Sequence, residues 1–335
     1  MKPRVSVVIP TYRRPDYIER CLKALLTQEF PPDEFEILVV DDGCDEETRQ
    51  RVAEVQQQAE SAGHRGHSSY TIRYIKGLGA QHPGHGPAAA RNIGWRAANS
   101  AIIAFTDDDC IPEQRWLRTG IATFQDDIAA ISGRIVTPLP ARPTDYEYTA
   151  AQITKSEFST ANSFYRRTVL AAVGGFDERF RIAWREDSDL YFTLLEQHEK
   201  CIFLYDAAIM HPVRPARWGV SLTQQRKSMY NALLYKKHPI LYRQHIQHAS
   251  PWRYYSTVGV LLVTLIAILC QVWLLSSIAF AVWLIMTLLF CAQRLRKTKH
   301  TPAHISEMLV TSALIPPLAI FWRIWGAIKF RVFFP

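Results

Sequence analysis

Acidic side chains follow two short β-rich runs in the first 110 residues of this 335-residue chain. Asp41 and Asp42 come after one run, and Asp107, Asp108 and Asp109 come after another. Carboxylates gathered in one place repel each other and raise one another's pKa unless a cation neutralises them. Their oxygens are the ligands that Mg²⁺ or Mn²⁺ takes, with phosphate oxygens completing the shell. The pattern therefore indicates a divalent metal that holds a phosphate chain.

A second acidic pair stands at the expected start of a helix. Glu186 and Asp187 follow Trp184 in the string WREDSDLYF. An acidic residue at this position ordinarily caps the helix. Close to a metal and a diphosphate, however, an ionised carboxylate would serve as general base for an acceptor hydroxyl.

Short β-rich runs alternate with helix-length amphipathic stretches through the first 210 residues. This order predicts an α/β fold with a mostly parallel sheet and helices on both faces. Ligands bind such sheets at the carboxyl ends of the strands, so the acidic residues are expected to share one edge. We expect strands at Val5 to Ile9, Glu36 to Val40, Thr71 to Ile75 and Ala101 to Phe105, and helices at Pro15 to Gln28, Glu46 to Ala62 and Pro87 to Ala98.

Six strings, in order, resemble the family 2 glycosyltransferases, which have the Rossmann-like glycosyltransferase-A fold. The resemblance covers about residues 3–215, and six strings in sequence are far more specific than any one of them. The strings are VSVVIPTYRR from Val5, ILVVDDG from Ile37, GPAAARNIG from Gly86, AFTDDDCIP from Ala104, GGFDE from Gly174 and WREDSDLYF from Trp184.

The resemblance implies an inverting hexosyltransferase that uses a nucleotide diphosphate donor, with a UDP-sugar favoured, and Mg²⁺ or Mn²⁺ as cofactor. Asp187 would be the general base, with Glu186 as its catalytic neighbour. Asp107 and Asp109 would be the paired aspartates of the metal motif, with Asp109 the favoured direct ligand. His211 would be a further metal ligand or a structural histidine. The donor would contact Pro10, Thr11, Arg13, Asp42, Arg91, Asn92, Asp107 and Asp108.

The string Arg214-Pro-Ala-Arg217-Trp218 resembles the QxxRW motif of polymer-making relatives, with Arg in place of Gln. Arg217 would meet the diphosphate and Trp218, like Trp184, would meet the acceptor or diphosphate; a solvated basic loop is the open alternative. The glycine-rich stretch with His64, His67, His82 and His85 has no thiolate or close carboxylate, so we expect a surface loop there and not a zinc site.

The charge of the chain is unevenly distributed. Its 39 Lys+Arg and 31 Asp+Glu residues give a net charge of +8. Eight basic residues and one acidic residue lie from Pro251 onward, where they flank apolar runs. A membrane therefore explains the basic excess, and no nucleic-acid polymer is expected as a partner.

Forty residues from Tyr254 to Gln293 carry no formal charge. One helix of that length would be ~60 Å long against a ~30 Å hydrocarbon core. We therefore expect two spans, at about 257–271 and 278–290, with both ends on the cytoplasmic side because basic residues flank them. For about 303–334 we expect interfacial helices broken at Pro316-Pro317, because a third span would place three basic residues outside.

The sequence thus predicts a cytosolic catalytic domain at 1–249 and membrane-anchoring helices at 250–335. The N-terminal apolar stretch is too short for a signal peptide, and the scattered cysteines fit a reducing compartment. We expect a transferase of the bacterial inner membrane that acts on a lipid-linked or glycan acceptor. A processive polysaccharide synthase and an inactive donor-binding scaffold remain as rivals. A dinucleotide-dependent oxidoreductase is disfavoured because no GxGxxG follows the first strand.

Overall fold

Two compact units make up the computed structural model, which describes residues 2–63, 70–78, 85–155 and 158–334. The first unit contains Met1–Pro138 and Ile153–Pro212, and the second contains Leu139–Gln152 and Val213–Pro335. This division differs from the expected boundary after residue 249, because two earlier segments pack with the C-terminal helices. His64, His67 and His82 lie outside the described residues.

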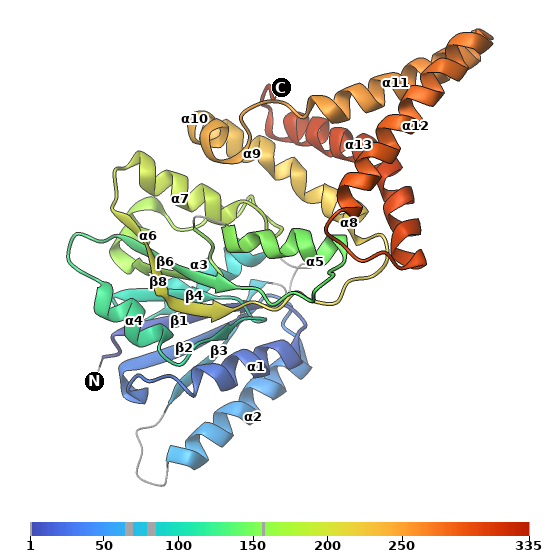
Figure 1. Ribbon diagram of the computed structural model, residues 1–335. Coiled ribbons are helices and arrows are strands. Elements are labelled where there is room, and N and C mark those ends of the chain that lie inside the picture. Colours follow the sequence, from blue (N-terminus) through green and yellow to red (C-terminus); the bar gives the residue numbers. More distant parts are fainter. Residues whose placement is uncertain (1, 64–69, 79–84, 156–157, 335) are drawn as a thin grey trace. The chain divides into compact units, whose positions relative to one another are not determined.

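A mixed sheet forms the centre of the first unit (Figure 1), with the strand order β3-β2-β1-β4-β7-β6-β8-β5. The strands β3, β2, β1 and β4 are parallel, whereas β7 is antiparallel to both β4 and β6. Because β6 and β8 are parallel to each other, both point the same way as β1. The bounds are β1 (Val5–Thr11), β2 (Phe35–Asp41), β3 (Thr71–Lys76), β4 (Ile102–Thr106), β5 (Ile111–Pro112), β6 (Ala130–Val136), β7 (Asn162–Arg166) and β8 (Cys201–Met210).

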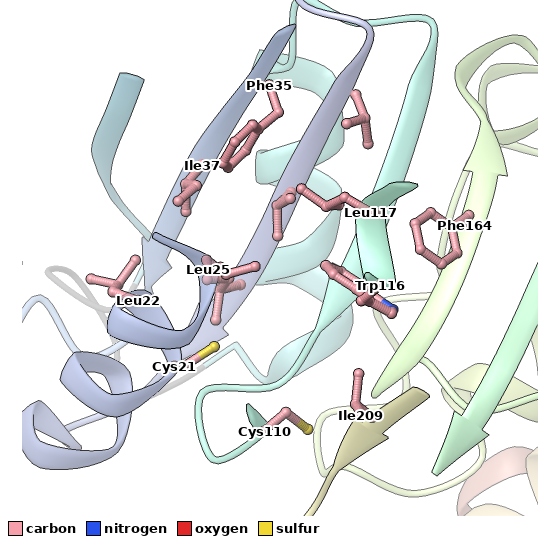
Figure 2. Packing of buried hydrophobic residues seen from close by; sticks show 14 of the residues in the cluster. Cys21, Leu22, Leu25, Phe35, Ile37, Cys110, Trp116, Leu117, Phe164 and Ile209 are labelled. Atoms are coloured by element: carbon pink, nitrogen blue, oxygen red, sulfur yellow. The ribbon is translucent and has the colours of Figure 1, made fainter. Parts of the chain in front are cut away.

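Helices cover both faces of this sheet, as alternation along β1 requires. Val7 packs into a cluster with α1, α2 and α4, part of which Figure 2 shows. Val8 packs into the opposite cluster, with α3, α6 and α7. The expected α/β fold is confirmed, and the four strands and three helices predicted end within three residues of their expected bounds. The helices are α1 (Pro15–Leu25), α2 (Glu46–Gly63), α3 (Pro87–Ala97), α4 (Trp116–Thr123), α6 (Arg167–Val173) and α7 (Glu186–Glu196).

A buried polar link connects α4 with the strands β7, β6 and β8 in the other half of the sheet. Trp116 Nε1 donates to Asn162 Oδ1 at 2.8 Å, and Asn162 Nδ2 donates to the carbonyl oxygens of Arg134 and Ala207, each at 2.9 Å. These bonds tie α4 and β7 to the carboxyl-terminal parts of β6 and β8, and so fix the point from which His211 leaves the sheet.

Helices make up most of the second unit. The helices α11 and α12 run antiparallel side by side (Figure 1), with Arg253 Nη1 donating to Gln293 Oε1 at 3.0 Å at their base. Both are longer than the expected spans, and the turn between them lies at 270–272. The elements are α5 (Asp145–Ala150), α8 (Val220–Gln224), η4 (Gln225–Met229), α9 (Tyr230–Lys237), α10 (Pro239–Leu241), η5 (Tyr242–Ile246), α11 (Trp252–Leu269), α12 (Trp273–Leu295) and α13 (Pro302–Phe330).

The last helix, α13, is continuous over 29 residues, so the expected break at Pro316-Pro317 is wrong. Each proline removes one backbone hydrogen bond. Packing of α13 against α12, η4 and α9 along its length outweighs that loss. Among the described residues, α11, α12 and α13 are long and apolar enough to cross a membrane.

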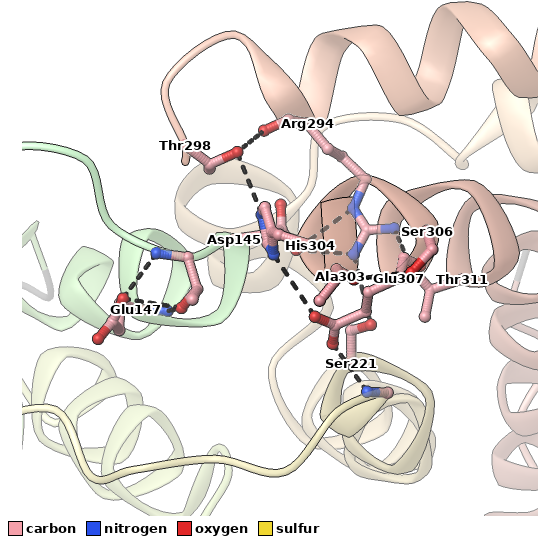
Figure 3. A network of polar contacts seen from close by, with 12 residues as sticks. Asp145, Glu147, Ser221, Arg294, Thr298, Ala303, His304, Ser306, Glu307 and Thr311 are labelled. Carbon is pink, nitrogen blue, oxygen red and sulfur yellow. Dashed lines mark hydrogen bonds and ion pairs between the residues drawn. The ribbon is translucent and has the colours of Figure 1, made fainter. Parts of the chain in front are cut away.

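One guanidinium joins four elements of the second unit (Figure 3). Arg294 of α12 donates to Asp145 Oδ2 of α5 at 2.7 Å, and to the hydroxyls of Thr311 and Ser312 of α13 at 2.6 and 3.1 Å. It also reaches Ser221 of α8 at 3.3 Å. Because Arg294 and Asp145 are largely buried, this ion pair is shielded from water and holds the helices in register.

Candidate active site

The topology brings the predicted site residues to one edge of the sheet. The carboxyl ends of β1, β2, β4, β6 and β8 all lie at that edge, because these strands run in the same direction. Asp107 follows β4 directly, and His211 follows β8 directly. Residues about 100 positions apart in the sequence therefore belong to one site, as the expected sheet requires.

Asp109 and His211 form the centre of a possible metal site. Asp109 Oδ1 lies 3.5 Å from His211 Nε2. Cys110 joins them, and one ligand atom from each of the three residues lies within 4.8 Å of the others, the one such group found among the described residues. A carboxylate oxygen and an imidazole nitrogen suit a divalent cation such as Mn²⁺. Sequence reasoning missed Cys110, although it follows Asp109 in AFTDDDCIP.

Asp107 is not one of these three residues, and its pairing with Asp109 in the metal motif stays a prediction. Its Oδ1 accepts a hydrogen bond from Arg91 Nη2 at 2.7 Å. The other guanidinium nitrogen, Nη1, donates to Glu186 Oε1 at 3.0 Å. Burial alone would lower the pKa of Arg91, but the carboxylates of Asp107 and Glu186 raise it above its usual range. Arg91 is thus a buried cation that binds the two acidic motifs together.

The two acidic residues at the start of α7 differ in burial and in hydrogen-bond partners. Glu186 is buried, and besides Arg91 its carboxylate accepts from the backbone N–H of Trp184 at 2.7 Å. Asp187 is only partly buried, and its Oδ1 accepts from Ser188 N at 2.7 Å. Burial raises the pKa of Asp187, and the Ser188 hydrogen bond partly opposes the rise. Asp187 is therefore the more accessible carboxylate of the pair, whereas Glu186 is bonded to Arg91.

Asp42 and Asp108, both expected to contact a donor, are bonded to the protein itself. Asp42 Oδ2 accepts from the backbone N–H of Gly86 at 2.8 Å. Asp108 accepts from Thr11 Oγ1 at 2.9 Å and from Arg14 Nη1 at 3.1 Å. Burial raises the pKa of Asp108 to about 6. The geometry gives both carboxylates a structural task, which is to hold the loops around the site.

Gly86 allows α3 to begin beside the site. Its φ of +94° lies in a region that side-chain-bearing residues rarely adopt, and a Cβ there would lie 2.4 Å from the carbonyl oxygen of Arg181. Pro87 follows as the first residue of α3, where its missing N–H costs nothing. The backbone conformation of Gly86 lets its N–H donate to Asp42, and α3 then packs its buried face against the sheet.

Asn92 has no capacity left for the expected donor contact. Its Nδ2 donates to Phe176 O and Glu178 Oε1, each at 2.8 Å. Its Oδ1 accepts from Phe176 N and Trp95 Nε1, each at 2.9 Å. Both amide hydrogens and both lone pairs are therefore used to tie α3 to the turn around Phe176.

The remaining predicted residues lie at three places. Pro10 and Thr11 end β1 and are buried, and Arg13, with φ +52°, lies over the Tyr12 ring. Trp184 is 39% exposed, with the Arg185 guanidinium 4.6 Å from its ring centroid. Arg217 and Trp218 belong to the second unit, where Trp218 is exposed, so their roles stay predictions.

Known proteins resemble this chain over most of its length. Two family profiles match: Glycosyl transferase family 2 at residues 6–180, and Glycosyl transferase family group 2 at residues 102–292. Glycosyltransferase AglE of Haloferax volcanii is 30% identical over 225 residues, which are 64% of this chain and 68% of that protein. Chondroitin synthase of Escherichia coli is 23% identical over 286 residues, 72% of this chain but only 39% of that protein.

A solved structure confirms the fold. The mannosyltransferase PcManGT from Pyrobaculum calidifontis, in complex with GDP-Man and Mn²⁺, matches with a TM-score of 0.58 and 19% sequence identity. The match covers 99% of this chain and 88% of that chain. At that identity the similarity speaks for the fold alone.

Proposed function

Because the chain belongs to glycosyl transferase family 2 and has the glycosyltransferase-A fold, we propose that it transfers a hexose with inversion from a nucleoside diphosphate donor to an acceptor hydroxyl. The acceptor is a lipid-linked or membrane-proximal glycan. One observation supports the proposal: Arg91 bridges the two acidic motifs, because it donates to Asp107, near Asp109, and to Glu186, the neighbour of Asp187.

Asp187 acts as the general base. Its accessible carboxylate takes the proton of the acceptor hydroxyl while the oxygen attacks the anomeric carbon, and the bond from that carbon to the diphosphate breaks on the opposite face. A single displacement of this kind inverts the anomeric configuration. The burial that raises the pKa of Asp187 makes it a stronger base than an exposed aspartate. Glu186 keeps Arg91, and through it Asp107, in place.

Asp109 and His211 would hold Mg²⁺ or Mn²⁺, since their ligand atoms already lie 3.5 Å apart. A cation bound there supplies positive charge to the departing diphosphate. The similar mannosyltransferase PcManGT was solved with GDP-Man and Mn²⁺, which supports both a nucleotide-sugar donor and a divalent metal. We favour a UDP-sugar, and GDP-mannose is the first alternative.

A screen of nucleotide sugars with Mn²⁺ or Mg²⁺ tests the proposal, with donor turnover as the readout. Asp187→Asn should lower kcat by about 10²- to 10⁴-fold with an unchanged donor Kd. Asp127→Asn is the matched control, because Asp127 pairs with Lys200 on the exposed surface. Sugar transfer at the wild-type rate by Asp187→Asn would exclude Asp187 as the base, and absence of turnover with every donor would favour an inactive scaffold.

Product length separates single transfer from processive synthesis. The similarity to chondroitin synthase is the reason to test for processive synthesis, although the matched region is only 39% of that protein. A synthase that passes its polymer across the membrane needs enough spans to form a channel. We therefore expect one added sugar per acceptor, and a ladder of products would support the synthase.

We propose that α11 and α12 span the membrane as a hairpin. With 18 and 23 residues they are about 27 and 35 Å long, which matches a ~30 Å hydrocarbon core. Arg253 and Arg294 stand at the shared base of the hairpin. The positive-inside rule puts this base, and the catalytic unit with it, on the cytoplasmic side of a membrane of the bacterial inner type.

The helix α13, in contrast, lies in the membrane interface. Its exposed apolar side chains form one stripe, which contains Val310, Leu314, Phe321, Trp325 and Ile328. Its buried polar side chains lie on the opposite face. A helix with one apolar stripe and one polar, protein-covered face suits the boundary between headgroups and acyl chains.

A basic strap, residues 219–237, runs along the buried face of α13. Gly219 N donates to Glu307 Oε1 near the start of α13, and Lys236 Nζ donates to the carbonyl oxygen of Phe330 at its end, at 2.7 and 2.8 Å. Between them Gly326 packs against the backbone of Met229. A spanning α13 would draw this charged strap into the hydrocarbon, at high cost.

Labelling with a membrane-impermeant maleimide distinguishes the two arrangements. In a background with Cys44→Ser and Cys201→Ser, the native Cys270 marks the hairpin turn, and Arg331→Cys together with Cys270→Ser marks the end of α13. An interfacial α13 puts the two thiols on opposite sides of sealed vesicles. Labelling of both from the same side would show that α13 spans.

A further inference from the structure

Cys110 adds a sulfur atom to a site that otherwise offers oxygen and nitrogen. The residue is fully buried and directly follows Asp109. Its Sγ, a carboxylate oxygen of Asp109 and a ring nitrogen of His211 all lie within 4.8 Å of one another. Figure 2 shows Cys110 beside Ile209, which precedes His211 by two residues in the chain.

The two classes of divalent cation use such a ligand set differently. Mg²⁺ and Mn²⁺ prefer oxygen and leave a thiol aside, whereas Zn²⁺ and Cd²⁺ bind thiolate sulfur strongly. Zinc sites with three protein ligands and one open position are built from Cys, His and carboxylate. The three residues here supply one ligand of each kind.

We propose that Zn²⁺ and similar thiophilic cations bind at this site through Cys110 as well as Asp109 and His211, and so displace Mg²⁺ or Mn²⁺. The metal–sulfur bond replaces the S–H bond, and the proton passes to solvent. The inference rests on the proposed metal site of the transferase, and it adds which divalent cations that site prefers.

The fold supplies a matched control for this ligand. Cys21 of α1 is also fully buried and belongs to the same apolar cluster as Cys110 (Figure 2). Cys21 is not part of the ligand group. Replacement of either cysteine by serine therefore removes one buried thiol from one cluster, but only Cys110→Ser removes a ligand.

Equilibrium dialysis of the full-length protein in detergent measures the affinities for Mn²⁺ and Zn²⁺, each alone and in competition. Cys110→Ser should weaken Zn²⁺ binding by about tenfold or more and change Mn²⁺ binding by less than about threefold. Cys21→Ser should change neither. In the wild-type protein, Cd²⁺ should produce the ultraviolet sulfur-to-metal charge-transfer absorbance, and Mn²⁺ should reduce it by competition.

Each outcome bears on one claim. Equal Zn²⁺ affinity in wild type and Cys110→Ser, or Cd²⁺ absorbance that Mn²⁺ does not reduce, would overturn the role of Cys110 and leave the Mn²⁺ site intact. If Asp109→Asn binds Mn²⁺ like the wild type, the proposed metal site itself is wrong. Cys110→Ala serves as a second variant, and the Cd²⁺ absorbance is compared between wild type and both Cys110 variants because Cys44, Cys201 and Cys270 are also free and accessible thiols.

Discussion

Replacement of Arg91 by methionine should destabilise the first unit strongly. The methionine side chain keeps similar volume but removes the cation that Asp107 and Glu186 share, at 2.7 and 3.0 Å. Glu186 is buried, so its charge is left without compensation. Removal of one partner from a buried ion pair costs about 3–5 kcal/mol.

This cost corresponds to a fall in melting temperature of about 6–20 °C, because each kcal/mol shifts Tm by about 2–4 °C in units of about 150–250 residues. The loss of stability in Arg91→Met relative to the wild type, which we call the deficit, should depend on pH. Burial already raises the pKa of Glu186, and loss of Arg91 raises it further. A carboxyl group whose folded pKa is raised favours the folded state at low pH, and this stability is lost as pH rises through the folded pKa. The deficit should therefore be smaller at pH 5 than at pH 8.

Thermal unfolding of the full chain in detergent, followed by intrinsic tryptophan fluorescence, measures the shift. Arg115→Met is the matched control, because Arg115 forms an exposed pair with Glu29 and should melt like the wild type. The double variant Arg91→Met, Glu186→Gln should recover part of the loss. The reasoning is refuted if Arg91→Met melts like Arg115→Met at pH 8, or if its deficit grows toward pH 5.

Three further changes test other parts of the structure, each by melting temperature. Gly326→Ala should cost about 1–3 kcal/mol because its Cβ would lie 2.4 Å from Met229 O, whereas Gly259→Ala, in open space, should cost nothing. Arg294→Met should lower Tm far more than Arg296→Met, because Arg294, unlike Arg296, pairs with Asp145, whose side chain is only 14% exposed. Burial raises the pKa of Asp108 to about 6, above the roughly 3.9 of an unfolded chain. The free energy of unfolding should therefore fall as the pH rises from about 4 to 6. Asp108→Asn should flatten that fall; equal slopes would contradict it.

The sequence predicted the half of the sheet in which each strand is followed at once by a helix. Hydrophobic periodicity and Pro15 or Pro87 at helix starts are local signals, and they located β1 to β4 and α1 to α3. The strands β6, β7 and β8 are connected instead through the side chain of Asn162. It bonds to Trp116 of α4 and to the carbonyl oxygens of Arg134 and Ala207. Such a bond connects residues far apart in the chain, and no local pattern reports it.

The same limit applies to the site residues, whose catalytic and binding roles stay predictions. The motif strings identified segments that the fold brings together, because Asp109 Oδ1 lies 3.5 Å from His211 Nε2 and Asp187 stands in the first turn of α7. The strings could not say which polar side chains the protein uses for its own structure. That depends on partners such as the Gly86 N–H for Asp42 and the Phe176 backbone for Asn92. The left-handed backbone of Arg185, beside the acidic pair, was equally unreadable.

Charge balance gives a physical reason for a cation at this site. Arg91 lies between two of the carboxylates. Burial raises the pKa of a third, Asp187, and the charge of Arg185 partly opposes that rise. When all four carboxylates are ionised, they and the two guanidiniums leave a charge of −2, which one divalent cation would cancel. A diphosphate is itself an anion and would be repelled without that cation. Metal and donor should therefore bind together, through a site whose acidic groups are Asp107, Asp109, Glu186 and Asp187 and whose basic groups are Arg91 and Arg185.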